Sequence, residues 1–345
     1  MSDAEVAEAI EDARRTLGSD LTILGHHYQR DEVIRHADFR GDSLDLSRRA
    51  AEVREARFIV FCGVDFMAET AAILCHSGQT VVQPVIEAFC PMAAFANATN
   101  AAQAYTVLTG LWGDDVTPIT YQNSVAEAKA FVGQHGGAVC TSANAGRIMR
   151  WAFGQSGHVL FLPDEHLGTN TALAMGIPRD EVGVWDHEAP PDPAFLARCR
   201  VVVWKGYCYV HTVMTPEDVI HAREQYPDAI VVVHPECPHE VVALSDTTGS
   251  TTGIIEVVKA APSGATIVVG TEWHLVNRLD HEYPDKRVVP LRRMECGPMT
   301  MTTARDLLYV LDDIMAGTPH NIVTVDDDTA HWARIALQRM LDAPA

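Results

Sequence analysis

Several features of common protein classes are missing from this sequence of 345 residues. No Cys-X-X-Cys pair is present, and zinc ribbons and fingers draw their ligands from such closely spaced pairs, which makes a zinc module of that kind improbable. No apolar run approaches the roughly 20 residues of a membrane-spanning helix. The stretch from Met1 to Leu17 is acidic and has a helical pattern, unlike a secretory signal peptide. We therefore expect a cytoplasmic protein with no membrane partner.

Basic residues are also scarce, with 26 Lys and Arg against 46 Asp and Glu and a net charge of −20. This balance argues against nucleic acid as a partner. It does not exclude anionic substrates, because helix N-termini and buried cations bind anions locally. Lys129 and Lys205 are candidates for neutralising an anion, although we expect both side chains to be solvated. The hydrophobic fraction of 47% is typical of a soluble globular protein, and the length suggests two or three domains.

What the chain does contain is a pattern that occurs three times. In each copy an apolar strand ends in a polar cluster, and an amphipathic helix follows, which is half of a βαβ unit. The three strands with their polar ends cover residues 21–28, 117–123 and 230–236. Each copy continues with a hydroxyl-bearing turn that can cap a helix and leave backbone N–H groups free for an anion. These turns are Gly41-Asp42-Ser43, Cys140-Thr141-Ser142 and Gly249-Ser250-Thr251.

Two more strands and one cysteine complete each copy. The later strands are predicted at 58–61 and 80–85, at 159–162 and 201–204, and at 266–269 and 287–291. The cysteines that follow are Cys90, Cys208 and Cys296. His26 precedes Cys90 by 64 residues and His234 precedes Cys296 by 62, while an extra Pro-rich stretch at 186–198 lengthens the middle copy. The copies therefore align over their whole length.

This alignment predicts an α/β fold of three homologous αβα domains, each with a small parallel sheet, around a pseudo-threefold axis. Functional residues of such sheets lie at the carboxyl ends of the strands, so the polar clusters of the three copies are expected to share one central cavity. We predict segments at 1–105, with an N-terminal helix, at 106–218 and at 219–300, followed by C-terminal helices at 301–345 that pack back on the body.

One cysteine at the same place in each copy is hard to explain by packing. Three thiolates that converge on the axis can hold an iron–sulfur cluster and leave one iron open as a Lewis acid. The other cysteines are interpreted as structural, with Cys62, Cys140 and Cys199 in the core and Cys75 on a helix. Cys237 follows a polar strand end but has no counterpart in the other copies, so an inert buried thiol is its default interpretation.

The polar clusters supply candidates for acid–base chemistry. His26, His211 and His234 lie beside repeat-related strand ends or a candidate ligand, and histidine can move protons near neutral pH. Tyr28 and Tyr121 can donate hydrogen bonds or protons. Glu236 is a candidate base or orienting group.

Taken in order, the motifs resemble those of the quinolinate synthase family over residues 20–315. The resemblance is carried by Gly25-His-His-Tyr-Gln29, Gly41-Asp-Ser-Leu44, Phe61-Cys-Gly-Val-Asp-Phe-Met-Ala-Glu69, Tyr121-Gln-Asn-Ser-Val-Ala-Glu-Ala-Lys129, Cys140-Thr-Ser-Ala-Asn144, Leu162-Pro-Asp-Glu-His-Leu-Gly168, Gly206-Tyr-Cys-Tyr-Val-His211, Val233-His-Pro-Glu236, Gly249-Ser-Thr251 and Cys296-Gly-Pro-Met-Thr-Met301. Each motif alone is weakly specific, whereas the ordered series is highly specific. Around Cys90 and after Cys296 the neighbouring residues depart from the usual family pattern, which affects local loop geometry and removes no ligand.

The resemblance implies a condensation of iminoaspartate with dihydroxyacetone phosphate to quinolinate, with loss of phosphate and water, as a step of NAD biosynthesis. It implies a 4Fe-4S cluster on Cys90, Cys208 and Cys296. It places the active site at His26, Tyr28, Ser43, Tyr121, Asn123, Ser142, His211, His234, Glu236 and Thr251. An aspartate-oxidising enzyme is a possible partner, as the source of the imine.

Three alternatives are compatible with parts of this pattern. Another 4Fe-4S hydro-lyase acting on a small hydroxy acid would share the open iron and lack a phosphate site. A cluster-based oxygen or iron sensor would normally carry a basic nucleic-acid-binding motif, which this sequence does not show. A sugar-phosphate or nucleotide-binding α/β protein would carry the cysteines only incidentally.

Overall fold

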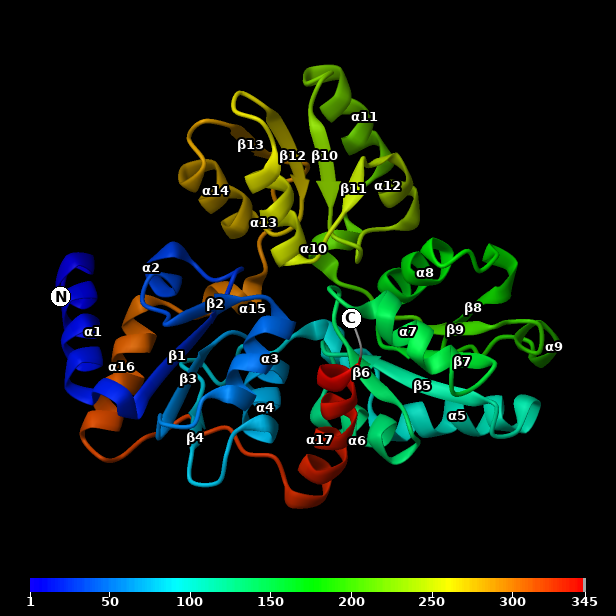
Figure 1. The fold of residues 1–345 in the computed structure, drawn as a ribbon, viewed down its shortest axis with the longest axis horizontal. Coiled ribbons are helices and arrows are strands. Elements are labelled where there is room, and N and C mark those ends of the chain that lie inside the picture. The colour runs from blue at the N-terminus through cyan, green and yellow to red at the C-terminus, as the bar shows by residue number, and fades with distance from the viewer. Residues whose placement is uncertain (344–345) are drawn as a thin grey trace.

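The computed structural model describes residues 1–343 and contains three separate β-sheets, each in its own lobe of the molecule (Figure 1). Every strand pair within these sheets is parallel. The prediction of an α/β protein with three small parallel sheets flanked by helices is therefore confirmed.

The first lobe is built on a four-stranded sheet in the order β2-β1-β3-β4. Its strands are β1 (Leu21–His26), β2 (Phe39–Gly41), β3 (Phe58–Cys62) and β4 (Thr80–Val82). Its helices are α1 (Asp3–Leu17), η1 (Gly18–Asp20), α2 (Asp31–Ile34), α3 (Ser43–Glu52), α4 (Asp65–Leu74) and η2 (Pro91–Phe95), and α5 (Ala98–Trp112) leads into the next lobe.

The second lobe has five strands in the order β6-β5-β7-β9-β8. They are β5 (Val116–Tyr121), β6 (Ala138–Cys140), β7 (His158–Leu162), β8 (Val182–Trp185) and β9 (Val201–Trp204). Its helices are α6 (Ala126–Gln134), α7 (Ala145–Phe153), α8 (Glu165–Ala174), η3 (Arg179–Glu181), α9 (Pro193–Leu196) and α10 (Tyr209–Thr212). Strand β8 was not predicted from the sequence, and together with α9 it accounts for the greater length of the middle copy.

The third lobe returns to four strands in the order β11-β10-β12-β13. They are β10 (Ile230–Val233), β11 (Thr247–Thr248), β12 (Thr266–Gly270) and β13 (Arg287–Pro290). Its helices are α11 (Pro216–Gln225), α12 (His239–Leu244), α13 (Thr251–Ala260), α14 (Trp273–Glu282) and α15 (Gly297–Met301).

The chain then leaves the third lobe and runs back over the other two. Helix α16 (Ala304–Met315) packs beside α1, and α17 (Asp327–Asp342) packs beside α6, as Figure 1 shows in orange and red. Each of the predicted segments 1–105, 106–218 and 219–300 holds one sheet, and the boundaries themselves stay a prediction. Residues 344–345 of the last segment lie outside the described residues.

The three sheets share four equivalent strands, and the middle sheet adds β8 at one edge. Strands β1, β5 and β10 are central, and each is flanked by the strand that follows it and by the third strand of its own copy. Residues of these central strands are buried almost throughout, because helices cover both faces of each sheet. This explains why they read as continuous apolar runs instead of alternating ones. Within the described residues no helix is both long and apolar enough to cross a membrane.

Candidate active site

A cavity lies where the three lobes meet, and all thirteen site residues predicted from the sequence line it. They are His26, Tyr28, Ser43, Cys90, Tyr121, Asn123, Ser142, Cys208, His211, His234, Glu236, Thr251 and Cys296. The free volume of the cavity is about 60 Å³. Apolar side chains such as Phe66, Val210 and Met299 complete the wall. The carboxyl ends of parallel strands from three copies thus face one space, while the role of each residue stays a prediction.

The three cysteines of the cavity occupy equivalent backbone positions. Each stands immediately before a short helix, namely η2, α10 and α15. Their φ and ψ angles are −84° and 115° for Cys90, −88° and 118° for Cys208, and −83° and 101° for Cys296. Because this conformation repeats at sites about 90 to 120 residues apart, it reflects the internal repeat and not local packing.

Hydrogen bonds tie each cysteine loop to the start of the helix that follows the third strand of its own copy, namely α4, α8 or α14. The carbonyl groups of Ala88, Gly206 and Met294, each two residues before a cysteine, accept backbone N–H groups from Asp65, Glu165 and Trp273. In two copies a carboxylate adds a second tie. The N–H of Cys90 donates to Asp65 Oδ1 at 2.9 Å, and the N–H of Cys296 donates to Glu272 Oε1 at 3.3 Å.

The donor chemistry of this cavity fits an iron–sulfur cluster. Burial raises the pKa of the Cys90 and Cys296 thiols, to about 12 for Cys296. The Cys296 thiol and Asp65 add to the effect on Cys90, and Glu272 and Glu236 add to the effect on Cys296. Burial, Glu236 and the two other cysteines raise the pKa of Cys208 well above its ordinary value. Thiols that disfavour each other's ionisation in this way become thiolates only when a bound cation compensates the charge. Three soft sulfur donors are the ligands that iron–sulfur clusters use.

His26 and His234 hold their rings in the same way in two different lobes. The Nδ1 of His26 accepts the N–H of Tyr28 at 3.1 Å, and the Nδ1 of His234 accepts the N–H of Glu236 at 3.3 Å. Burial lowers the pKa of both imidazoles, to about 3 for His234, so both rings are neutral. With Nδ1 occupied as an acceptor, each neutral ring carries its proton on Nε2 and can donate it to a ligand.

A chain of hydrogen bonds links the three lobes across the cavity wall. Tyr28 Oη lies 2.6 Å from Thr271 Oγ1, which lies 3.0 Å from His211 Nε2. His211 Nδ1 lies 2.7 Å from Glu236 Oε2, and the Tyr121 hydroxyl donates to Glu236 Oε1 at 2.5 Å. Thr271 was missed from the sequence, although it directly follows the predicted strand β12.

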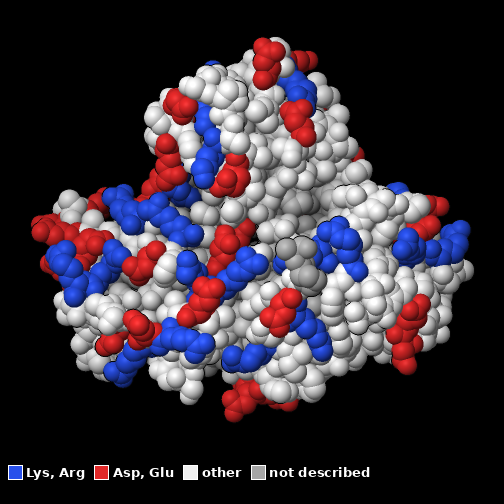
Figure 2. Space-filling model, in the orientation of Figure 1, with Lys and Arg blue, Asp and Glu red and all other residues white. Residues whose placement is uncertain are grey.

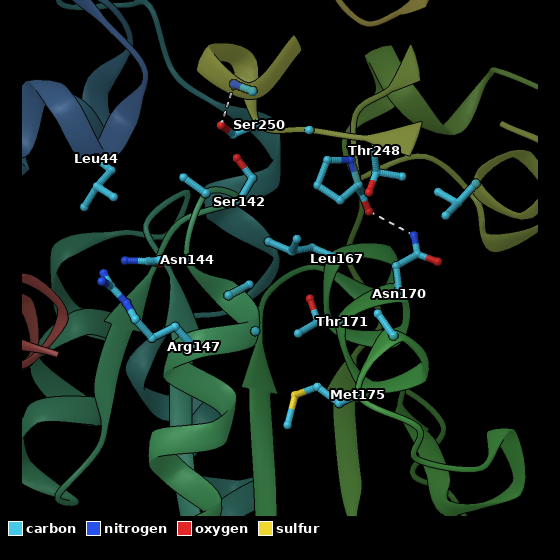
Figure 3. Close-up of a pocket in the computed structure, with 18 of the residues that line it drawn as sticks. Leu44, Ser142, Asn144, Arg147, Leu167, Asn170, Thr171, Met175, Thr248 and Ser250 are labelled. Carbon is cyan, nitrogen blue, oxygen red and sulfur yellow. Dashed lines mark hydrogen bonds between the residues drawn. The ribbon is translucent and has the colours of Figure 1, made fainter. Parts of the chain in front are cut away.

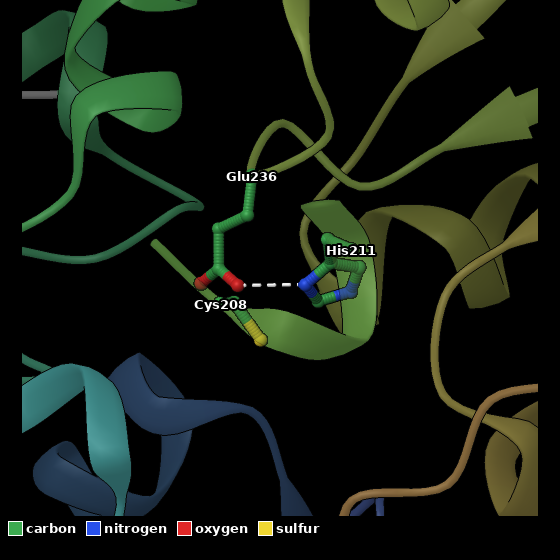
Figure 4. A group of neighbouring side chains, drawn as sticks. All are labelled: Cys208, His211 and Glu236. Atoms are coloured by element: carbon green, nitrogen blue, oxygen red, sulfur yellow. Dashed lines mark hydrogen bonds and ion pairs between the residues drawn. The ribbon is translucent and has the colours of Figure 1, made fainter. Parts of the chain in front are cut away.

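Glu236 is the anionic member of this network. Burial alone would raise its pKa, but His234, His211 and the hydrogen bonds from His211 and Tyr121 bring the pKa down to about 2. Asp164 behaves in the opposite way, because burial and the charge of Glu236 raise its pKa well above the ordinary value. Figure 4 shows Glu236, His211 and Cys208 together, with one ligand atom of each within 4.8 Å of the others. The acid–base network therefore adjoins the thiol centre.

The expectation that the hydroxyl-bearing turns cap helices is confirmed in two of the three copies. Asp42 caps α3 by accepting from the N–H groups of Leu44 and Asp45, and Ser250 caps α13 by accepting from Gly253. Helix α7 has no such side-chain cap. Ser43, Ser142 and Thr251 still line the cavity. The Oδ1 atom of Asn123, also in the wall, has no hydrogen-bond partner among the described residues, as is expected of a group that binds a ligand.

Three lesser expectations have mixed outcomes. Lys129 was expected to be solvated, and this is wrong, because its side chain is completely buried and donates to the carbonyl of Ser124. Lys205 is exposed and pairs with Asp186, as expected. Cys62, Cys140, Cys199 and Cys237 are fully buried, and none of them lines the cavity.

Fold and site together define a three-lobed α/β enzyme whose central cavity is shared between internal repeats. The sequence profile of the family described as Quinolinate synthetase A protein matches residues 8–342. The chain is 45% identical to a quinolinate synthase of Bacillus pumilus over 98% of this chain and 92% of the relative. It is also 45% identical to one from Corynebacterium glutamicum, over 99% of this chain and 88% of the relative. The chain belongs to the quinolinate synthase family, whose members are 4Fe-4S enzymes of NAD biosynthesis.

Proposed function

We propose that this chain condenses iminoaspartate with dihydroxyacetone phosphate in the central cavity, with Cys90, Cys208 and Cys296 as the ligands of its cluster. Quinolinate synthase activity follows from the family. The observation that supports the site is the meeting of three repeat-related thiols with a neutral-histidine and carboxylate network in one cavity. Formation of quinolinate from the two substrates releases inorganic phosphate and two molecules of water and needs no external oxidant.

A bound cluster with one iron free of protein ligands supplies a Lewis acid for a substrate hydroxyl or carboxylate. The chain's own residues do the rest. The hydroxyl groups of Ser43, Ser142 and Thr251 come from the three lobes and bind substrate oxygens. The neutral rings of His26 and His234 donate hydrogen bonds from Nε2 to the negatively charged substrate atoms. Asn123 offers its free Oδ1 to a substrate N–H or O–H group.

Proton transfer is assigned to the chain from Tyr28 to Glu236. The anionic Glu236 holds the proton of His211 on Nδ1, which leaves His211 Nε2 as an acceptor for the hydroxyl of Thr271. Thr271 Oγ1 in turn accepts from Tyr28. Burial raises the pKa of Tyr28 well above its usual value, so Tyr28 rests as a neutral phenol. When Tyr28 takes a proton from the substrate, its own proton moves to Thr271 and the Thr271 proton moves to His211 Nε2, where the carboxylate of Glu236 stabilises the imidazolium. Glu236 has both oxygens engaged, and its role in this state is to orient His211 and Tyr121.

The ligand assignment is tested on protein purified without air. Cys90→Ala, Cys208→Ala and Cys296→Ala are each expected to lose bound iron and sulfide and to make no quinolinate. The matched control is Cys75→Ala, which removes a half-buried thiol at the end of α4 outside the cavity. Full iron occupancy and full turnover in all three cavity variants would refute the assignment.

The hydro-lyase alternative predicts a different product balance. Such an enzyme would dehydrate a hydroxy acid and release no phosphate from dihydroxyacetone phosphate. Measuring quinolinate and phosphate in equal amounts from the two substrates supports the synthase.

We also propose a cytoplasmic location for the protein and delivery of the unstable imine by an aspartate-oxidising enzyme. The delivery is tested by comparing rates with free and with enzymatically generated imine.

A further inference from the structure

A second, larger opening lies directly outside the central cavity, with a volume of about 710 Å³ (Figure 3). Its wall comes from all three lobes, and we call it the arginine cleft after Arg48, Arg147 and Arg150. Ser142 lines both the cleft and the central cavity. Leu44 and Ser250 of the cleft are chain neighbours of Ser43 and Thr251 of the cavity. The cleft therefore adjoins the place where the substrates react.

The charge of the cleft is opposite to that of the protein. Three arginines and no Asp or Glu are among its lining residues, although acidic residues outnumber basic ones by 46 to 26 in the chain. None of the three guanidinium groups pairs with a carboxylate within residues 1–343. Figure 2 shows basic side chains bordering the hollow where the three lobes meet. Such a positive opening in an otherwise negative molecule attracts anions.

Two side chains in the cleft carry donors without acceptors. Asn144 is only 6% exposed, and its Oδ1 accepts from the N–H and hydroxyl of Thr141 at 2.7 and 3.3 Å. This fixes the amide orientation, and its Nδ2 finds no partner in the described part of the chain. The Nε and Nη2 atoms of Arg147 are likewise buried without a partner there. Figure 3 shows the nitrogen atoms of both side chains near each other.

The backbone adds further donors at the same place. Asn144 is the N-cap residue of α7, but its side chain makes no capping hydrogen bond, because it is turned toward Thr141. The first residues of α7, Ala145 and Gly146, line the cleft. The first N–H groups of a helix have no partner within the helix, and they carry the positive end of its dipole. An anion beside Asn144 and Arg147 would meet these groups as well.

We propose that the arginine cleft is a docking site for the phosphate group of the triose phosphate, occupied before this substrate passes Ser142 into the cavity and again when phosphate leaves. This rests on the proposed function of the cavity. A phosphate monoester has three terminal oxygens and two charges. The guanidinium fork of Arg147, the amide of Asn144 and the open end of α7 offer more donors than a single carboxylate accepts.

The test compares Arg147→Gln and the double variant Arg147→Gln/Arg150→Gln with Arg54→Gln, which removes an exposed arginine outside the cleft. In the air-free holoenzyme, KM for dihydroxyacetone phosphate is expected to rise about tenfold in Arg147→Gln, the size of one lost charge-assisted hydrogen bond. The kcat and the KM for the imine should stay within twofold of wild type. The affinity for inorganic phosphate, measured by calorimetry, should fall in parallel. Asn144→Asp, which places a negative charge against the anion, should raise KM for the triose phosphate further.

A wild-type KM and wild-type phosphate affinity in the folded double variant would overturn the docking site. A higher KM for the imine with an unchanged KM for the triose phosphate would overturn it too, because the occupant would then be a dicarboxylate. If instead the proposed function were wrong, the wild-type enzyme itself would release no phosphate from dihydroxyacetone phosphate, so the two failures can be told apart. In that case the calorimetric comparison of phosphate binding still decides whether the cleft is an anion site. Iron content and circular dichroism show that each variant is folded.

Discussion

Asp38 and Asp246 make the same three contacts in two different lobes. Asp38 Oδ2 accepts the N–H of Ile23 at 2.7 Å, and Asp246 Oδ2 accepts the N–H of Val231 at 2.7 Å. The other carboxylate oxygen of each accepts from an arginine of the helix before the central strand of its lobe, Arg14 on α1 or Arg223 on α11. The backbone N–H of each aspartate also donates to the carbonyl of the same strand residue at 2.9 Å.

The middle lobe has no such aspartate, because its strand β5 lacks an N–H group at the equivalent position. Strand register places Pro118 where the other copies have Ile23 and Val231. Proline has no N–H group, so no acceptor is needed beside it. The residue that stands in place of the aspartate, Gly137, packs so closely that a Cβ there would lie 1.8 Å from the Pro118 carbonyl oxygen. The two positions have thus changed together between the copies.

Asp246→Ala is expected to lower the free energy of unfolding by about 1–3 kcal/mol, because the buried N–H of Val231 loses its acceptor. Urea unfolding followed by circular dichroism measures this change. Asp228→Ala, at an exposed position in the turn before β10, is the matched control and should change stability by less than about 0.5 kcal/mol. Equal effects of the two substitutions would contradict the role given to Asp246.

The same contact predicts a pH dependence. Burial tends to raise the pKa of Asp246, but the N–H of Val231 and the guanidinium of Arg223 outweigh it and lower the pKa below 3.8. A carboxyl whose pKa is lower in the folded state stabilises the fold above its unfolded pKa and loses that effect as the pH falls. The stability difference between wild type and Asp246→Ala should therefore be constant from pH 5 to 7 and shrink below about pH 4. A difference that grows on acidification would be inconsistent with this explanation.

Lys129 gives a prediction about the buried wall behind Cys90. Its ammonium group donates to the Ser124 carbonyl, lies 5.5 Å from the centre of the Phe66 ring, and faces Glu69 and Asp65. Burial lowers its pKa to about 8, so it remains charged at pH 7. Lys129→Met leaves two partly buried carboxyl groups without a cation and should cost about 1–3 kcal/mol of stability.

Lys205→Met is the matched control for this substitution. Lys205 pairs with Asp186 at 2.5 Å, but its side chain is 58% exposed, and exposed pairs contribute less than about 1 kcal/mol. Thermal melting of the two variants under the same conditions compares the effects. Similar melting temperatures for both would show that Lys129 is not needed to neutralise the carboxyl groups of Asp65 and Glu69.

Thr271→Val tests the proton path with little change of shape. The substitution removes the hydroxyl that bridges Tyr28 and His211 and leaves the other hydrogen bonds of the network in place. We expect kcat to fall roughly 10²-fold, as for loss of a positioned proton-transfer group, with KM and iron content retained. Thr271→Ser restores the hydroxyl and should recover most of the rate. If Thr271→Val turned over at the wild-type rate, the path through Thr271 would be excluded.

Much of this architecture is predictable from the sequence because the same pattern, an apolar strand followed by polar residues, occurs in all three copies. Parallel strands buried on both faces must be apolar runs, and the residues that follow them must meet at one edge of each sheet. The same rule predicts that His26, Tyr121 and His234 stand at comparable strand ends. The three cysteines, predicted at equivalent places in the three copies, also have nearly the same backbone angles.

What the sequence did not indicate depends on contacts between copies or on single exceptions to the pattern. Lysine is almost never fully buried, so the burial of Lys129 could not be inferred without knowing that Asp65 and Glu69 of another lobe lie beside it. Strand β8 was overlooked because Gly183 interrupts its short apolar run. The turn at 140–142 was expected to cap a helix like the other two, but α7 has no side-chain cap, because the side chain of its N-cap residue Asn144 accepts from Thr141 instead.

The loop before Cys208 gives the last prediction, because it has no room for a side chain. A Cβ on Gly206 would lie 2.1 Å from the Pro163 carbonyl oxygen and 2.9 Å from the Cβ of Phe95. The carbonyl of Gly206 also accepts the N–H of Glu165 at 2.8 Å, which fixes the loop to the start of helix α8. Gly206→Ala must therefore move the loop and with it the sulfur of Cys208.

We expect Gly206→Ala purified without air to contain less than half the iron and sulfide of wild type while its far-ultraviolet circular dichroism is retained, because each sheet has its own core. Gly110→Ala is the matched control, since a Cβ there meets nothing within 4 Å on helix α5. It should keep full iron and gain about 0.5–1 kcal/mol of stability, as alanine favours a helix over glycine. A folded Gly206→Ala protein with a full complement of iron would mean that the position of Cys208 does not limit cluster binding.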